Sequence, residues 1–333
     1  MLAFLLTLAF ITAGGARNAD ARLSGGFIQY KSEMLSQMDK AKWKSTLKAM
    51  REVKLDTIIL QFHQYGGTKF IPEGTAGVDA TKIILDYAKD NGMQVFVGLK
   101  YDTRWYGNWK DQKYLEEVAA ENKKLAKQLW ERYGKSRAFA GWYVPQEMWN
   151  EDYTPQELEQ LGKYFRDVGD ECRRLAPGKP VAVSPYFNPG FGFLGADAFG
   201  QRYAQFLKFA GLNIVMLQDS VGARKIAPEE FEDKVLPYYS ALQAAAQQNG
   251  AELWGNAESY EIVPNQPDEN KFQPTDICRV AKQINAGAPF VKKLVTFDFF
   301  HYMNPYGFTY EDANYRDRQR RLYEGYKSQF ALN

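Results

Sequence analysis

The chain has 333 residues, of which 45% are hydrophobic and 25% charged, a balance typical of a globular protein with a large core. Its 42 Lys and Arg against 40 Asp and Glu leave a formal net charge of +2, so nothing in the charge predicts binding to nucleic acid. Only two Cys and two His are present, which excludes zinc clusters and His-rich metal sites, and we expect neither a metal nor another cofactor.

The N-terminal segment is read as a targeting signal and not as part of the fold. Leu2 to Ile11 are almost wholly apolar, too short a run to span a bilayer, and Ala19-Asp20-Ala21 fits an A-x-A cleavage site. No Lys or Arg precedes the run, so a buried first helix or a wrongly assigned start codon is the alternative. We expect a signal peptide over residues 1–21 and an exported, periplasmic or extracellular protein over 22–333. No further run approaches the length of a membrane span, and we expect a monomer without stable membrane insertion.

Eight short apolar runs recur along the chain, rich in Val, Ile, Leu and aromatic residues, as in strands buried on both faces. We expect strands at 24–30, 56–62, 94–100, 138–144, 180–184, 212–218, 252–256 and 293–299. Each run precedes a segment with helical periodicity. We expect helices over 40–53, 79–90, 115–133, 155–175, 198–210, 228–249, 274–287 and 311–329.

Two of these helices carry clear start signals. Asp79 is a candidate N-cap, and Thr154-Pro155-Gln156-Glu157 reads as a capping box with Pro at the first helical position. Cys172 and Cys278 fall on helices that are not neighbours, which favours two separate buried thiols over a disulfide.

Eight strand–helix units in sequence predict an α/β protein with one (β/α)8 TIM barrel. Two doubly wound domains are the alternative, but no Pro-, Ser- or Gly-rich linker marks a boundary between them.

In such a barrel, chemistry resides where strands end and βα-loops begin. Aromatic rings pack on sugar C–H faces and amides bind hydroxyls, so the residues at these positions predict a carbohydrate substrate. The expected substrate-binding residues are Gln29, Gln61, His63, Asp102, Trp105, Gln146, Trp149, Tyr186, Asn188, Asp219, Asn256, Tyr260, Asp298 and His301. Tyr30, Lys100 and Gln218 also end strands.

Two glutamates carry the catalytic prediction. Glu147 ends the fourth strand and Glu258 the seventh, on opposite sides of an eight-stranded barrel. Glycosidic cleavage needs one carboxyl to protonate the leaving oxygen and a second to attack the anomeric carbon or activate water. A separation of about 5–5.5 Å would allow double displacement with retention.

This arrangement resembles the large clan of retaining (β/α)8 glycoside hydrolases, which carry Glu at the ends of strands 4 and 7. The resemblance implies that Glu147 is the acid/base and Glu258 the nucleophile, with Tyr186 or Tyr260 hydrogen-bonded to it. The clan usually has Asn before the acid/base, whereas this chain has Gln146. Gly25–Gln29 and Ile58–Gln61 also look like a bacterial, glycosidase-like barrel family of unassigned function.

Other interpretations of the same residues stay open. An Asp219 or Asp298 partner for Glu147 would give a wider spacing and inversion. In another interpretation, both glutamates form ordinary ion pairs with Lys and Arg. In a third, the barrel is catalytically inert and binds glycans for a cell-envelope complex.

Three further features of the sequence bear on the site. Gly190–Gly195 matches G-x-G-x-x-G, but it follows the fifth strand and has Phe in its gaps, so it reads as an aromatic loop over the site. His63 and His301 with an Asp would make a metal site, although a hydrogen-bonding role at a sugar pocket is preferred. Pro264–Pro274 reads as a long loop that closes one side of the cleft.

Overall fold

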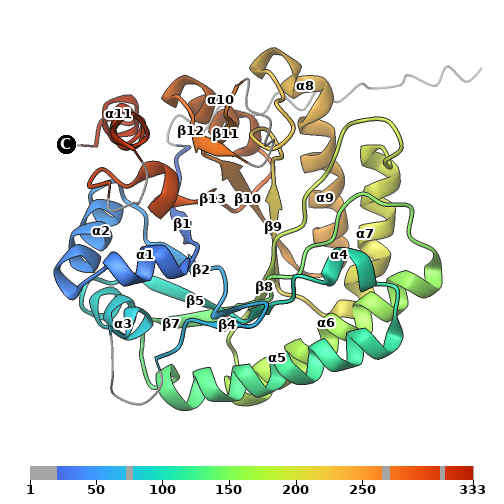
Figure 1. The fold of residues 1–333 in the computed structure, drawn as a ribbon. Helices are drawn as coiled ribbons and strands as arrows, with labels where there is room; N and C mark the ends of the chain where they lie inside the picture. Colours follow the sequence, from blue (N-terminus) through green and yellow to red (C-terminus); the bar gives the residue numbers. More distant parts are fainter. Residues whose placement is uncertain (1–20, 73–77, 265–270, 308–311, 333) are drawn as a thin grey trace, which may run out of the picture.

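The computed structural model describes residues 21–72, 78–264, 271–307 and 312–332. Eight parallel strands close into a barrel in the order β1-β13-β10-β9-β8-β7-β5-β2 (Figure 1). Their bounds are β1 Gly25–Ile28, β2 Thr57–Leu60, β5 Gln94–Gly98, β7 Phe139–Tyr143, β8 Val181–Val183, β9 Ile214–Gln218, β10 Glu252–Glu258 and β13 Lys293–Phe297. Each lies within or overlaps a predicted apolar run, and the predicted single (β/α)8 barrel is confirmed. The predicted signal peptide lies outside the described residues, apart from Ala21.

Helices surround this barrel, as Figure 1 shows. They are α1 Ser32–Gln37, α2 Lys40–Glu52, α3 Ala80–Asp90, α4 Trp105–Asn108, α5 Gln112–Tyr133, α6 Pro155–Leu175, α7 Ala196–Ala210, α8 Phe231–Lys234, α9 Leu236–Gln248, α10 Ile277–Gly287 and α11 Ala313–Gln329. Among the described residues, none of them is both long and apolar enough to cross a bilayer.

The predicted start signals are present. The Asp79 side chain accepts from the Lys82 N–H, and Thr154 and Glu157 form the reciprocal capping box of α6. The single helix predicted over 228–249 is wrong. That segment holds a 3₁₀ turn, Pro228–Glu230, then α8 and α9, because Pro237 lacks the N–H that would continue α8 into α9.

The two cysteines are free thiols. Cys172 is buried in α6, as predicted, but the prediction of burial is wrong for Cys278, which is exposed on α10.

Side chains fill the barrel interior and the layer between strands and helices. The interior cluster is Phe27, Ile59, Phe96, Tyr143, Ala182, Ile214, Met216, Trp254 and Val295. The larger outer cluster takes the alternate strand residues and the inner faces of the helices. Strand alternation therefore decides which residues can reach the barrel mouth.

Two small sheets stand on the carboxyl ends of the barrel strands. β3 (Gln64–Tyr65) pairs with β4 (Thr68–Lys69) and with β6 (Lys100–Tyr101). β11 (Tyr260–Ile262) pairs antiparallel with β12 (Phe272–Pro274), so the end of the expected 264–274 loop is a strand. A π-helix, Phe299–Met303, follows β13.

Candidate active site

A cavity of about 350 Å³ lies at the carboxyl ends of the barrel strands. Six of the eight barrel strands contribute the residue two positions beyond an interior side chain. Gln29, for example, follows Phe27, Gln61 follows Ile59, and Asn256 follows Trp254. The full lining is Gln29, Gln61, Phe62, Tyr65, Tyr101, Tyr106, Tyr143, Glu147, Ser184, Gln218, Asn256, Tyr260, Phe272 and Phe297. Amides, hydroxyls and aromatic rings thus surround one carboxyl group.

That carboxyl group belongs to Glu147, four residues after β7 ends. Its Oε1 accepts from Gln218 Nε2 at 2.8 Å, and its Oε2 accepts from the Tyr106 hydroxyl at 2.5 Å. Burial raises the pKa of Glu147 above its usual value, and these two hydrogen bonds offset part of the rise. A carboxyl group with a raised pKa in a cavity is suited to donate a proton.

The Glu147 main chain is also held. Its carbonyl accepts from Trp105 Nε1 at 2.7 Å, so α4 contacts Glu147 through both Trp105 and Tyr106. Trp105 itself is 1% exposed and packs on α6, where it positions this segment and does not line the cavity.

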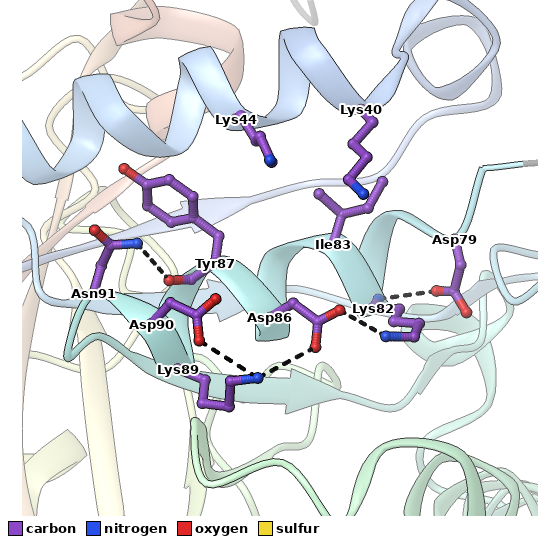
Figure 2. Close-up of a pocket in the computed structure, with 10 residues that line it drawn as sticks. All are labelled: Lys40, Lys44, Asp79, Lys82, Ile83, Asp86, Tyr87, Lys89, Asp90 and Asn91. Carbon is purple, nitrogen blue, oxygen red and sulfur yellow. Dashed lines mark hydrogen bonds and ion pairs between the residues drawn. The ribbon is translucent and has the colours of Figure 1, made fainter.

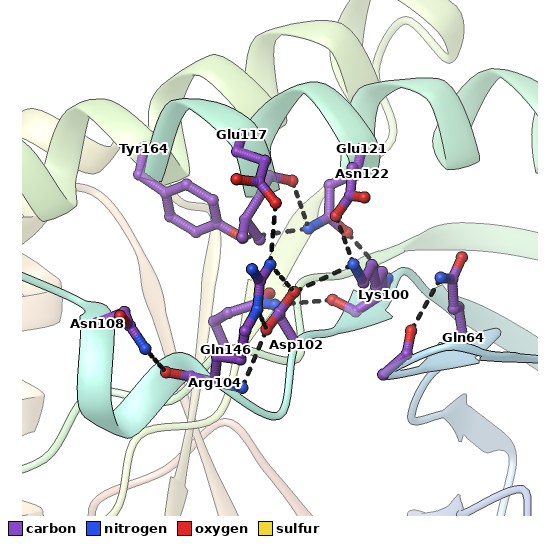
Figure 3. A network of polar contacts seen from close by, with 12 residues as sticks. Gln64, Lys100, Asp102, Arg104, Asn108, Glu117, Glu121, Asn122, Gln146 and Tyr164 are labelled. Atoms are coloured by element: carbon purple, nitrogen blue, oxygen red, sulfur yellow. Dashed lines mark hydrogen bonds and ion pairs between the residues drawn. The ribbon is translucent and has the colours of Figure 1, made fainter. Parts of the chain in front are cut away.

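A polar network fixes the segment that leads into α4 (Figure 3). Asp102 accepts from Arg104 and forms an ion pair with Lys100, whose ammonium also pairs with Glu121 of α5. Burial would raise the pKa of Asp102, but the hydrogen bonds and charges of Arg104 and Lys100 outweigh it and hold this pKa well below its usual range. The Asp102 carboxylate is therefore engaged within the protein.

Gln146 belongs to the same network. Its Nε2 donates to the Lys100 carbonyl at 2.8 Å, and it is 1% exposed (Figure 3). Gln146 does not line the cavity, so the amide that precedes Glu147 supports the backbone here.

Glu258 is enclosed beside the cavity. It is 1% exposed, and its Oε2 accepts from the Ala223 N–H at 2.7 Å. A Cβ at Gly222 would lie 2.1 Å from the Tyr260 carbonyl oxygen, so glycine is needed where this loop closes over Glu258. Tyr260 lines the cavity, and its hydroxyl bonds the Glu258 carboxyl. Glu258 itself is not among the lining residues.

A second buried acid lies next to Glu258. Asp219 accepts from Gln283 Nε2 at 2.7 Å and, through Oδ1, from the N–H groups of Val221 and Glu258. Burial and then the charge of Asp219 raise the pKa of Glu258, and burial raises that of Asp219.

Asp298 supports the cavity from behind. It is fully buried and accepts from the backbone N–H groups of Gln29 and His301. The His301 ring bonds the Gln29 carbonyl at 3.0 Å, so both main-chain groups of Gln29 are held. Gln29 Nε2 in turn donates to Gln61 Oε1 at 2.8 Å inside the cavity. Burial raises the pKa of Asp298 to about 7 and lowers that of His301 to about 3.

The remaining predicted residues pack around this site. His63 is fully buried, and its ring nitrogens bond the Gly98 carbonyl and the Thr81 hydroxyl. Trp149 stacks on Tyr186 at 5.9 Å, and Asn188 bonds Asn150 through its main chain. None of these lines the cavity. Of the predicted set, the cavity collects Gln29, Gln61, Glu147, Asn256 and Tyr260.

Residues from the small sheets and α4 were missed. Tyr65, Tyr101, Tyr106 and Phe272 line the cavity but lie outside the eight main strands, so no strand-end rule selects them. The spacing of strand residues could have predicted Ser184 and Phe297, because each lies two positions after an interior residue.

The largest hollow formed by the described residues of α2 and α3 has a different lining. A groove of about 620 Å³ lies between α2 and α3 on the outside of the barrel, lined by lysines and aspartates (Figure 2). Lys82 and Lys89 pair there with Asp86. In the described part of the chain, no three His, Cys, Asp or Glu side chains gather as metal ligands would.

Known structures share the barrel. A candidate alpha-L-fucosidase from Bacteroides thetaiotaomicron superposes with a TM-score of 0.77 at 20% identity, covering 100% of this chain and 99% of that one. An endo-beta-1,4-mannanase from Thermotoga petrophila gives 0.58 at 13% identity, covering 94% and 78%. At these identities the resemblance to (β/α)8 glycoside hydrolases is confirmed for the fold.

Sequence comparisons point to proteins of unassigned function. The uncharacterized protein YbcH of Escherichia coli K12 is 25% identical over 217 residues, which cover 62% of this chain and 68% of YbcH. Residues 23–308 match the model of a domain of unknown function, DUF4434, and the chain belongs to that family.

Proposed function

We propose that this chain is an exported glycoside hydrolase that cleaves a poly- or oligosaccharide with retention, using Glu147 as acid/base and Glu258 as nucleophile. The observation that carries the proposal is Glu147: a carboxyl group with a raised pKa, held by Tyr106 and Gln218 in a cavity of amides and aromatic rings. The fold shared with glycosidases supports it.

The cavity has the chemistry of a sugar site. Gln29, Gln61, Gln218 and Asn256 offer amide donors and acceptors to hydroxyl groups. Asn256 is 1% exposed, and its buried Oδ1 has no hydrogen-bond partner in the protein. Because such an atom costs free energy when unpaired, it favours a ligand with a donor group.

In the first step, the Glu258 carboxylate forms a bond to the anomeric carbon as the glycosidic C–O bond breaks, and the Glu147 proton passes to the leaving oxygen. In the second step, Glu147 takes a proton from water, the water oxygen bonds the anomeric carbon, and Glu258 leaves. One water is consumed for each bond cleaved.

The surroundings of Glu258 support its role as nucleophile and also set a requirement. The Ala223 N–H and the Tyr260 hydroxyl hold its carboxylate. Glu258 does not line the cavity, so the proposal requires that the groups enclosing it, the Tyr260 side chain and the Gly222–Ala223 segment, rearrange before a sugar can reach it. The two aspartates are less suited to the inverting alternative, because Asp219 and Asp298 each accept several protein hydrogen bonds.

A second candidate function is glycan binding without turnover. The enclosure of Glu258, which is 1% exposed, favours it, because an inert carboxyl needs no path to the ligand. The amide and tyrosine lining would serve a binding protein equally well.

Turnover separates the two candidates. We would screen 4-nitrophenyl glycosides, including the alpha-L-fucoside and beta-D-mannoside, together with beta-1,4-mannan and xylan. Glu147→Gln and Glu258→Gln should each lower kcat by roughly 10²–10⁴-fold. Glu116→Gln, an exposed position on α5, is the matched control and should behave as wild type.

Azide tests the assigned roles. In Glu258→Ala, azide should replace the missing nucleophile and yield a glycosyl azide of inverted configuration; in Glu147→Ala, it should trap the intermediate with retained configuration. Wild-type binding of a glycan with no turnover of any substrate would favour the second candidate.

A further inference from the structure

A second hollow opens from the catalytic cavity. It measures about 360 Å³, and its lining includes Gln29, Tyr30, Phe62, Tyr65, Thr68 and Phe70. Gln29, Phe62 and Tyr65 line both hollows, so the two meet at these side chains. The second hollow lies between the chain that enters α1 and the β3–β4 hairpin.

Tyr65 presents a flat aromatic surface where the two hollows meet. Its ring stacks on Tyr101 with centroids 5.5 Å apart and planes 7° apart, and it packs against Phe62 at 5.2 Å. These contacts fix the ring, yet the side chain remains 45% exposed. A large aromatic surface held open beside a polar cavity is suited to stack on the C–H face of a sugar.

Gln29 and Phe62, the other two residues that line both hollows, are also held in place by their contacts. Gln29 is held by Asp298 and His301 through its main chain, and its side chain bonds Gln61. Phe62 is 3% exposed and packs on Phe70, the far wall of the second hollow. Each hollow reaches the lower end of the volume range of small-molecule sites, so together they suit a ligand longer than one sugar unit.

We propose that the substrate is a glycan chain of at least two units, with one unit in the catalytic cavity and the next stacked on Tyr65 in the second hollow. This rests on the proposed function and adds to it the place where the second sugar unit binds. Chains should bind more tightly than the matching monosaccharide, and the advantage should depend on Tyr65.

The test measures affinity against chain length. The probes are ladders from one to six units of beta-1,4-linked mannose, xylose and glucose, titrated calorimetrically into wild type, Tyr65→Ala and Tyr87→Ala. Tyr87 lies on the outer helix α3 and is a matched control. We expect affinity to rise from one unit to three in at least one ladder, and Tyr65→Ala to reduce the affinity for the trisaccharide about tenfold more than that for the monosaccharide.

A second variant guards against misfolding of the first. Thr68 is exposed on β4 and lines only the second hollow of the two, so Thr68→Trp should fill that hollow and weaken chain binding selectively. Equal affinity for one unit and three in every ladder, or equal loss at all lengths in both variants, overturns the proposal. If either of these results is found while a 4-nitrophenyl glycoside is turned over, the proposed function is supported and only the chain site is refuted. If chains bind in a Tyr65-dependent way but no substrate is turned over, the proposed hydrolase activity is refuted and the proposed binding site for a glycan chain is supported.

Discussion

Removal of the Tyr106 hydroxyl should raise the pKa of Glu147. The hydroxyl donates to Oε2 at 2.5 Å and so stabilises the ionised carboxylate, against the effect of burial. A hydrogen bond to a charged group contributes about 1.5–3 kcal/mol. Because Tyr106 is 45% exposed, water replaces part of the lost bond, and the lower figure applies. About 1.5 kcal/mol corresponds to a rise of about one pKa unit in Tyr106→Phe.

The shift can be measured without knowledge of the substrate. Glutamate labelled with ¹³C at the side-chain carboxyl gives one NMR titration curve for each site, and the Glu147 signal is the one lost in Glu147→Gln. Tyr87→Phe removes a hydroxyl on the outer helix α3 and serves as control. If a substrate is found, the alkaline limb of kcat/KM should move upward by the same amount. A Glu147 pKa that stays constant or falls in Tyr106→Phe would refute the assigned role of this hydrogen bond.

Three further predictions concern the core and the second acid. Gly98→Ala should destabilise the fold by roughly 3 kcal/mol, since a Cβ would lie 2.1 Å from a backbone oxygen just after β2. Thermal melts measure the effect, with Gly107→Ala as the control because its Cβ would have open space around it. An equal loss of stability in the two variants would contradict the prediction. Burial lowers the pKa of His63 to about 4 from 6.5, so its contribution to stability is present above pH 6.5 and is lost on acidification towards pH 4. Chemical denaturation should show that the difference in the free energy of unfolding between wild type and His63→Gln falls by about 2 kcal/mol from pH 8 to pH 5. A difference that does not change with pH would argue against a buried, neutral His63. Asp219→Asn removes the charge that, after burial, raises the pKa of Glu258; the Glu258 ¹³C titration should move to lower pH, and an upward move would show that the two carboxyls do not repel.

The barrel could be predicted because buried parallel strands and amphipathic helices leave strong periodic signals. Gln29, Gln61 and Asn256 were predicted because they are polar residues at strand ends. They face the mouth because each lies two positions after an interior residue, Phe27, Ile59 or Trp254.

The rest of the site depends on short elements without such a signal. The position of Tyr65 follows from a two-residue strand, and Tyr106 lies on a helix of only four residues. His63 and Asp102 end or follow strands as predicted, yet Thr81 and Arg104 satisfy them within the protein. Sequence position shows that a polar residue is near the rim, but only its partners decide whether it faces a ligand.

Closure of the barrel joins segments that are made at very different times. Gly25 of β1 pairs with Val295 of β13, and the Leu23 N–H bonds the Tyr326 hydroxyl, 303 positions away. During synthesis, one edge of β1 therefore has no neighbour until β13 has left the ribosome. Such an edge can recruit strands from other chains, so a product truncated before β13 should aggregate, and the complete chain should fold late and slowly.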